Sequence, residues 1–467
     1  VDKSGPSPGP DPPCPSRTDG PTMRVGNISI GVAGAALAYA LNRLLADRQR
    51  AREIREALAN GFECVDLSDI ELQCAGEDAP ITVATVYEGI LGPEQVDSLR
   101  ARVAAAARAN PWLCGRLAPG ADRRRWIAVY APSKPPDSTL AEALVHVVDD
   151  PRLRPGLPLA EANALLYAHD MGGGALLSAQ GRTRGPVFRV TAVRGEGACA
   201  VVVALSHTAG DTSTLYRVHR MVAGIDPVEP LVFQRVPAPH EGPRAAGARW
   251  LMVGPVQRFS LAAVLSVLRR RQHHVLLELD QAAIAAAKAA RAHDPSGPAP
   301  YVSSWDVTAA ALYRALGGEA GAFTVSLRGR VPGVTAAHAG NYLALAVAPA
   351  WECQRPEGVR AALRAALGEY GLPAADDGRL PGLPCALAWR VALLTSWRMG
   401  PTEMPLPGCR AVGHFPTWIP GVSMPRFAVI FDAGPGRVAV AAHAHSAAAA
   451  DALRAMPIAK GPLVLAW

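Results

Sequence analysis

One uninterrupted apolar run, residues 198–205, most constrains how this chain can fold. It reads ACAVVVAL, and a valine-rich run of this length is typical of a fully buried strand. The run leads into Ser206–Asp211 (SHTAGD), and a helix-like stretch begins at Thr212. Asp211 is the predicted N-cap of that helix, so we expect His207 in a tight turn between strand and helix. Because the tip of a buried strand is a rigid mount, His207 is the first candidate for a functional side chain.

The rest of the chain has the length and pattern of a two-lobed protein. It has 467 residues, of which 49% are hydrophobic and 19% charged. A chain this long exceeds a simple single core, and we expect two lobes of roughly 180–200 residues each. Strands feed helices in both halves, which predicts a mixed α/β fold. Predicted strands include 81–87, 187–193, 273–280, 323–330, 343–347, 427–432 and 438–443, and predicted helices include 93–109, 212–222, 281–293, 303–313 and 359–370.

Composition divides the chain into five segments. These are a disordered leader (1–22), an apolar helix (23–60), an N-terminal lobe (61–222), a crossover linker (223–272) and a C-terminal lobe (273–467). The leader is rich in Pro, Gly and Ser and cannot form a core. The apolar stretch at 25–45 is followed by basic residues, which suits a membrane anchor with both lobes in the cytoplasm. A helix packed on the body of the protein is the alternative.

Charge and motifs exclude several classes of function. The net charge is +7, but the arginine clusters at 123–125 and 269–271 are short and isolated, so we expect no nucleic-acid partner. The eight cysteines include no C-x-x-C pair, which favours reduced thiols and an intracellular location. No G-x-S-x-G, P-loop or H-E-x-x-H motif occurs. His443 and His445 share a strand face, but they lack a third ligand at fixed spacing, and we expect no metal.

An ordered set of motifs resembles one enzyme superfamily. The motifs are Ala109–Leu117, the His-x-x-x-Asp of His207 and Asp211, Val302–Val307, Arg328-Gly329-Arg330 followed by Gly340-Asn341, and Thr395-Ser396-Trp397. Together they resemble the acyl-CoA-dependent acyltransferases of the chloramphenicol-acetyltransferase-like superfamily. That superfamily includes the BAHD enzymes, the wax ester synthase/diacylglycerol acyltransferases and peptide condensation domains. Two departures stand out: Thr212 follows the aspartate where these enzymes usually have glycine, and the BAHD motif Asp-Phe-Gly-Trp-Gly is missing, His414–Trp418 being the nearest stretch.

The resemblance implies a fold and an activity. The fold would be two lobes of mixed α/β structure with the active site in a tunnel between them. The protein would move an acyl group from acyl-CoA, as co-substrate, to a hydroxyl of a small, hydrophobic alcohol. It would work as a monomer without a bound cofactor, and a membrane surface would be a further partner if residues 25–45 form an anchor. The alternatives are an N-acyl or condensation-type transferase and a non-catalytic relative that binds a lipid or a partner.

The resemblance also assigns roles to residues. His207 would be the general base, and an imidazole suits this task because its ordinary pKa lies near 6.5. Asp211 would be structural, with its carboxylate turned to Arg328. The tetrahedral intermediate requires hydrogen-bond donors at its oxyanion. The candidates are Ser303, Ser304, Asn341 and Trp418.

Overall fold

The computed structural model describes residues 52, 55, 56, 58–68, 71, 80–118, 128–132, 134, 142–169, 187–236, 273–291, 299, 301–368, 391–400, 404–417 and 426–467. All but residue 52 belong to one compact unit, Glu53–Trp467. The predicted leader 1–22, the predicted anchor 25–45 and Trp418 lie outside the described residues, as does most of the predicted linker. Among the described helices, none combines the length and the apolar character needed to cross a bilayer.

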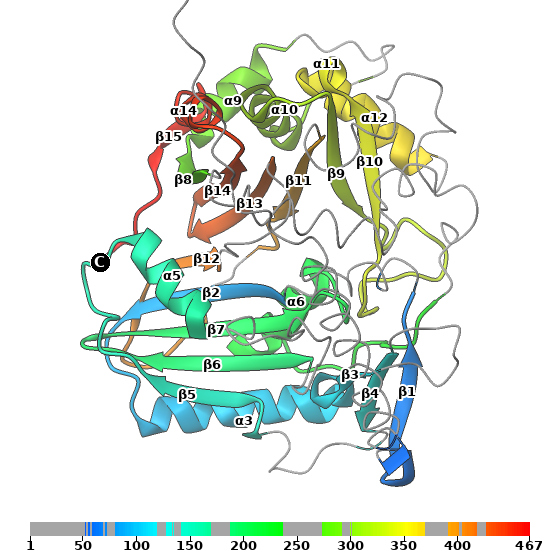
Figure 1. The fold of residues 1–467 in the computed structure, drawn as a ribbon, viewed down its shortest axis with the longest axis vertical. Helices are drawn as coiled ribbons and strands as arrows, with labels where there is room; N and C mark the ends of the chain where they lie inside the picture. Colours follow the sequence, from blue (N-terminus) through cyan, green and yellow to red (C-terminus); the bar gives the residue numbers. More distant parts are fainter. Residues whose placement is uncertain are drawn as a thin grey trace, which may run out of the picture. The chain divides into compact units, whose positions relative to one another are not determined.

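The first lobe is built on a five-stranded sheet that contains the strand leading to His207 (Figure 1). In spatial order its strands are β12 (Arg410–Pro416), β2 (Pro80–Glu88), β7 (Ala198–Ser206), β6 (Phe188–Arg194) and β5 (Val145–Asp149). Neighbours run antiparallel except β5 and β6. Every residue of β7 is buried, which agrees with its unbroken apolar sequence. β7 lies between β2 and β6, so it is a rigid support for the turn that follows.

Helices and a small sheet complete the first lobe. The helices are α3 (Pro93–Ala109), the 3₁₀ helix η1 (Pro111–Cys114), α5 (Leu159–His169) and α6 (Thr212–Ala223). The small antiparallel sheet has the order β1 (Phe62–Asp66), β4 (Ala128–Pro132) and β3 (Arg116–Ala118). α3 begins with Pro93 and buries Val96, Leu99 and Val103 on one face. Proline suits the first helical turn, and this face has the spacing of an amphipathic helix.

The second lobe is built on a seven-stranded mixed sheet. In spatial order its strands are β10 (Leu343–Pro349), β9 (Ala320–Ser326), β11 (Val391–Trp397), β13 (Phe427–Gly434), β14 (Arg437–Ala444), β8 (His273–Leu279) and β15 (Ala459–Pro462). β11 runs parallel to β9 and β13, and the other pairs are antiparallel. β9 ends at Ser326, four residues before the predicted end, because the chain turns at Gly329, whose φ is 70°.

Helices cover the face of this sheet that is turned away from the first lobe (Figure 1). They are α9 (Gln281–Ala289), α10 (Ser304–Leu316), α11 (Ala350–Cys353), α12 (Pro356–Gly368) and α14 (Ala447–Arg454). Their starts follow from local sequence, because Asp280, Ser303 and Ser446 each accept a backbone N–H as N-caps. The apolar side chains between sheet and helices form the core of this lobe.

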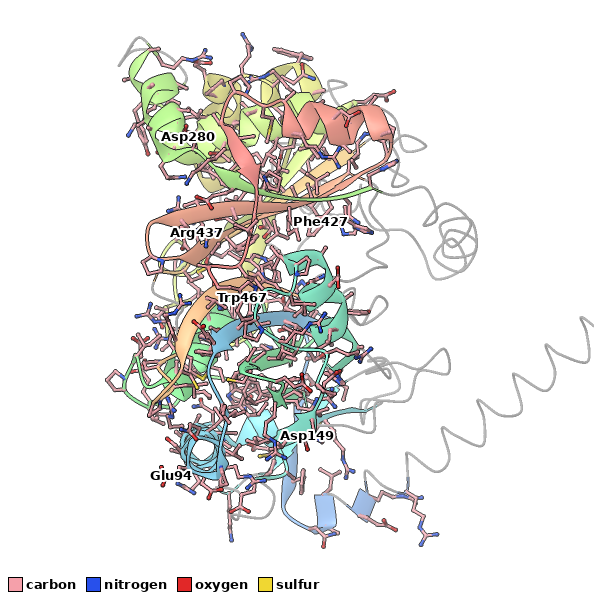
Figure 2. The ribbon with its side chains drawn as sticks, turned by 90° about the vertical axis from the view of Figure 1, so that its left-hand side faces the viewer. Glu94, Asp149, Asp280, Phe427, Arg437 and Trp467 are labelled. Atoms are coloured by element: carbon pink, nitrogen blue, oxygen red, sulfur yellow. The ribbon has the colours of Figure 1, made fainter. Side chains whose placement is uncertain are left out.

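Two C-terminal segments return to the first lobe. β12 pairs with β2 and forms the edge of the first lobe's sheet, although it belongs to the predicted C-terminal segment 273–467. At the end of the chain, the Trp467 indole donates to the carbonyl of Leu157 at 3.0 Å. Figure 2 shows Trp467 between Arg437 in the second lobe and Asp149 in the first. The structure confirms the predicted mixed α/β fold with two lobes, but β12 of the predicted C-terminal segment belongs to the first lobe's sheet.

Candidate active site

The turn from β7 to α6 places His207 and Asp211 as their spacing predicts. Asp211 caps α6, accepting the Thr214 N–H at 2.9 Å and the Thr214 hydroxyl at 3.0 Å. Gly210 fits tightly before it, since a Cβ there would lie 2.8 Å from Cγ2 of Thr214 and 3.1 Å from a Leu205 methyl. His207 therefore sits in a turn whose two ends are fixed by a buried strand and a capped helix.

Arg328 holds the Asp211 carboxylate across the lobes. Its Nη1 donates to Oδ2 at 2.6 Å and its Nη2 to Oδ1 at 3.0 Å, and the two side chains are only 8% and 7% exposed. Nη2 also donates to the carbonyl of Gly340 at 2.8 Å, and Nε to that of His338 at 2.9 Å. A bidentate contact of this kind fixes geometry as well as charge. The Asp211 carboxylate thus accepts hydrogen bonds from Arg328 and from Thr214 at the start of α6.

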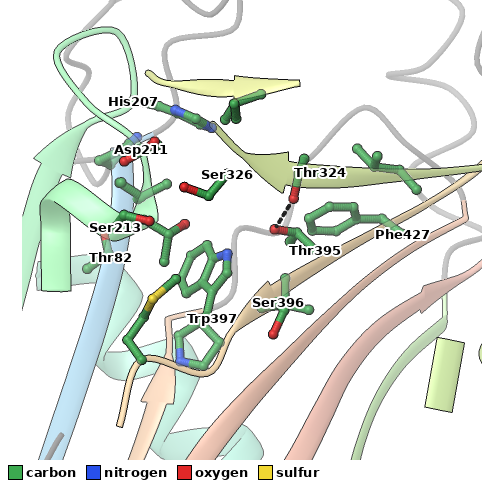
Figure 3. Close-up of a pocket in the computed structure, with 18 of the residues that line it drawn as sticks. Thr82, His207, Asp211, Ser213, Thr324, Ser326, Thr395, Ser396, Trp397 and Phe427 are labelled. Carbon is green, nitrogen blue, oxygen red and sulfur yellow. Dashed lines mark hydrogen bonds between the residues drawn. The ribbon is translucent and has the colours of Figure 1, made fainter. Parts of the chain in front are cut away.

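His207 faces a pocket of about 280 Å³ that residues of both lobes line (Figure 3). The first lobe contributes the start of β2, the His207 turn and the end of β12, and the second contributes β9, β10, β11, β13 and β14. The lining residues include Ile81, Thr82, Ser213, Thr324, Ser326, Leu343, Leu393, Thr395, Ser396, Trp397, Met399, Pro416, Phe427 and Val429. Most of these side chains are apolar or carry a hydroxyl. The pocket can therefore hold an uncharged, largely apolar molecule beside an imidazole.

The nitrogens of His207 are not equivalent. Nδ1 is buried and bonds to no other described group, so Nε2 is the nitrogen left to meet a molecule in the pocket. A second histidine, His443, lines the pocket from β14. Burial, together with the neighbouring His274, lowers the pKa of His443 to about 2, so this side chain is neutral. Within the described residues, no group of three His, Cys, Asp or Glu side chains gathers as a metal site requires.

Three of the predicted oxyanion donors point elsewhere. The Ser303 hydroxyl donates to Asp306 at 2.8 Å in the capping box of α10. Ser304 lines a separate pocket beside α9 and α10. The Asn341 amide is buried and donates to the backbone carbonyl of His207 at 2.7 Å, so it holds the turn. None of the three is among the described residues that line the His207 pocket. The fourth candidate, Trp418, lies outside the described residues.

Hydroxyl side chains of the second lobe line the His207 pocket. The Thr324 and Thr395 hydroxyls are 3.0 Å apart in the pocket, and Figure 3 shows the hydrogen bond that joins them. One of them donates to the other, which leaves one hydroxyl hydrogen for a bound molecule. The Ser326 oxygen accepts the Arg328 N–H at 3.4 Å, so its own hydrogen is available as well. Thr395 belongs to a motif that the sequence had singled out, whereas no local pattern marked Ser326.

Strand β12 carries a buried histidine, His414. His414 on β12 bonds to the Thr85 hydroxyl through Nδ1 at 2.9 Å and to the Tyr216 hydroxyl through Nε2 at 3.0 Å. His219 packs edge-on against it, with ring centroids 5.4 Å apart. Burial lowers the pKa of His219 to about 4 and that of His414 well below its ordinary value. These rings are neutral packing groups that attach β12 to the first lobe.

Comparison with known proteins agrees with this architecture. No family model and no curated protein matches the sequence. Among solved structures, TRI101 of F. graminearum, complexed with coenzyme A and T-2 mycotoxin, is similar with a TM-score of 0.59 and 13% identity, over 84% of this chain and 97% of that one. Vinorine synthase is similar with a TM-score of 0.54 and 15% identity. The chain has the chloramphenicol-acetyltransferase-like fold.

A third match places a different kind of protein on the same chloramphenicol-acetyltransferase-like fold. The condensation domain of the monacolin K polyketide synthase MokA is similar with a TM-score of 0.50 and 12% identity, over 84% of this chain and 94% of that one. Vinorine synthase matches over 84% and 91% respectively. At these identities the likeness shows the fold alone, which confirms the fold expected from the motifs. The roles of the site residues depend on the geometry above.

Proposed function

We propose that this protein transfers an acyl group from acyl-CoA to a hydroxyl of a hydrophobic small molecule, with His207 as general base. One observation carries the proposal: His207 lines a pocket shared by both lobes, while Asp211 is turned to Arg328. The imidazole is left to accept a proton from a substrate. The carboxylate fixes the turn and takes no part in proton transfer.

The chemistry follows from this placement. Nε2 of His207 accepts the proton of the acceptor hydroxyl as its oxygen attacks the thioester carbonyl. The tetrahedral intermediate then collapses, the C–S bond breaks, and the imidazolium returns its proton to the leaving thiolate of coenzyme A. Hydroxyls of Ser326 and of the Thr324–Thr395 pair line the pocket and are the proposed donors to the oxyanion.

The pocket favours an uncharged acceptor. No lysine or arginine is among the described residues that line it, and its one carboxylate, Asp211, is already paired. His443 is neutral because burial lowers its pKa to about 2. An anionic acceptor would lose its hydration here without gaining a counter-ion. The structures of TRI101 with coenzyme A and with T-2 mycotoxin or deoxynivalenol support a coenzyme A thioester and a compact organic acceptor.

Coenzyme A release by the purified chain tests the proposal. Acyl-CoAs of increasing chain length are combined with a panel of alcohols and amines, and free thiol is measured for wild type, His207→Ala and a control. His273→Ala is the control, because this exposed histidine lies on β8 and is not among the pocket residues. Loss of a general base should reduce turnover by about 10²- to 10⁴-fold.

Each other outcome has a definite meaning. Equal turnover by wild type and His207→Ala would refute His207 as the base. Folded wild type that binds an acyl-CoA without releasing coenzyme A would be a non-catalytic relative of this fold. Turnover with amines alone would indicate N-acyl transfer by the same base, the alternative that the likeness to a condensation domain keeps open.

A further inference from the structure

A second buried ion pair, Glu71–Arg235, lies against the His207 turn, and the proposed chemistry gives it no task. Nε of Arg235 donates to Oε2 of Glu71 at 2.8 Å, and the two side chains are 10% and 0% exposed. Burying two charges is expensive, so such a pair is weak evidence for stability. Its neighbours suggest a different role.

The pair contacts two segments that meet beside His207. Nη2 of Arg235 donates to the carbonyl of Ala209 at 3.0 Å, inside the turn between His207 and Asp211. Nη1 donates to the carbonyl of Ala339 at 3.1 Å. Oε1 of Glu71 accepts the backbone N–H of Asn341 at 2.9 Å. One ion pair therefore fixes the turn and the segment 339–341 relative to each other.

Segment 339–341 in turn contacts His207 directly. The side chain of Asn341 donates to the His207 carbonyl at 2.7 Å. Gly340 lies between the two ion pairs: its carbonyl accepts from Arg328 at 2.8 Å, and a Cβ on it would lie 3.1 Å from both Cζ of Arg235 and Oε1 of Glu71. Only a glycine fits there, at a φ of 135°. The close fit leaves little freedom for the segment to shift.

The arginine itself rests on a rigid aromatic stack. Its guanidinium lies over the ring of Phe233, with Cζ 4.1 Å from the centroid. Phe233 is stacked on Trp112 with centroids 4.4 Å apart, and both rings are buried. A planar guanidinium held by stacking and by a carboxylate has few alternative orientations. The contacts to Ala209 and Ala339 are therefore made by a preorganised group.

We propose that Glu71 and Arg235 are positioning residues that set the orientation of His207 in the pocket. The inference rests on the proposed function, in which His207 is the base. Neither residue is among the described residues that line the pocket, so they act through the Ala209 carbonyl and through Asn341. Asp211–Arg328 holds one side of the turn, and Glu71–Arg235 holds the other.

The test compares this pair with an equally buried one elsewhere. Arg360 donates to Asp306 at 2.7 Å with side chains 9% and 0% exposed, and it joins α12 to the start of α10. The variants are Glu71→Gln and Arg235→Lys, with Asp306→Asn and Arg360→Lys as controls. Both sets should lower the melting temperature. Because a base misplaced by about 1 Å can cost about 100-fold, only the first set should lower kcat to that extent per folded molecule, with KM little changed.

A second readout follows His207 directly and needs no turnover. In protein labelled with [¹³C]histidine, the Cε1–H resonance of His207 is assigned by its loss in His207→Ala. Glu71→Gln and Arg235→Lys should shift or broaden this resonance, and the control variants should leave it in place. Arg235→Lys keeps the charge but cannot reach Glu71, Ala209 and Ala339 together, so it serves even if Glu71→Gln does not fold.

The Cε1–H resonance of His207 tests the proposal independently of the kcat values. If it moves in the folded variants of the Glu71–Arg235 pair and stays in the controls, the pair positions His207. An unmoved resonance overturns the proposal. Failure of the proposed function has a separate signature, which is equal turnover by wild type and His207→Ala.

Discussion

Replacing Asp211 by Asn measures what the ion pair between the lobes contributes to folding. In the variant, Arg328 keeps the carbonyls of His338 and Gly340 as acceptors, but its charge loses the counter-ion at a site where its side chain is 8% exposed. Removing one partner of a buried pair costs about 3–5 kcal/mol. The amide oxygen of Asn can still accept the Thr214 N–H, so the N-cap, which contributes about 1 kcal/mol, is retained.

A loss of this size is easily measured. Folded proteins of this kind are stable by about 5–15 kcal/mol, so the variant should lose about a fifth of that or more. Urea unfolding at pH 7.5 gives the free energy from the midpoint and slope. Arg328→Met should cost a similar amount, because it leaves the Asp211 carboxylate with only the N–H and O–H donors of Thr214 and the N–H of Tyr342. The double variant should lose less than the sum of the two.

Two results would refute this reasoning. A loss below about 1 kcal/mol in Asp211→Asn would mean that the pair behaves like an exposed ion pair. Strict additivity in the double variant would mean that the two side chains do not interact in the folded protein.

Three further predictions concern single side chains. Burial lowers the pKa of His219 from 6.5 to about 4, so the unfolded chain binds a proton that the folded chain does not. Stability should therefore fall as the pH falls below 6.5, with His219 contributing on the order of 2 kcal/mol between pH 7.5 and 5, and His219→Gln should flatten that slope in urea unfolding. Gly210→Ala places a Cβ 2.8 Å from Thr214 Cγ2 and should cost about 1–3 kcal/mol and lower kcat, whereas unchanged values would show that the turn is loose. Ser303→Ala should lower the free energy of unfolding by about 1 kcal/mol, because the capping box with Asp306 is lost, and should leave kcat unchanged. A lower kcat would indicate that Ser303 takes part in the reaction.

Local sequence determined the elements that carry the site. The apolar run of β7 is buried at every residue, and Asp211 caps α6, as the pattern predicts. Helix α3 has the predicted bounds, and Ser303 and Asp280 cap the helices that follow them. These features depend on side-chain periodicity and on hydrogen bonds between residues a few positions apart, and both can be read along the chain.

Tertiary structure decided which of these residues meet at the pocket. Residues 410–416 form the edge strand of the first lobe's sheet, although they follow the strand β11 of the second lobe. Ser303 is bound within its own helix cap, while Ser326 and Thr395 line the pocket. Glu71 reaches Arg235 across 164 positions, and Asn341 reaches His207 across 134. Contacts of this range depend on the path of the whole chain, and no local pattern of charge or hydropathy encodes them. The sequence by itself therefore predicted the turn that carries His207, and the packing of the two lobes determined what surrounds it.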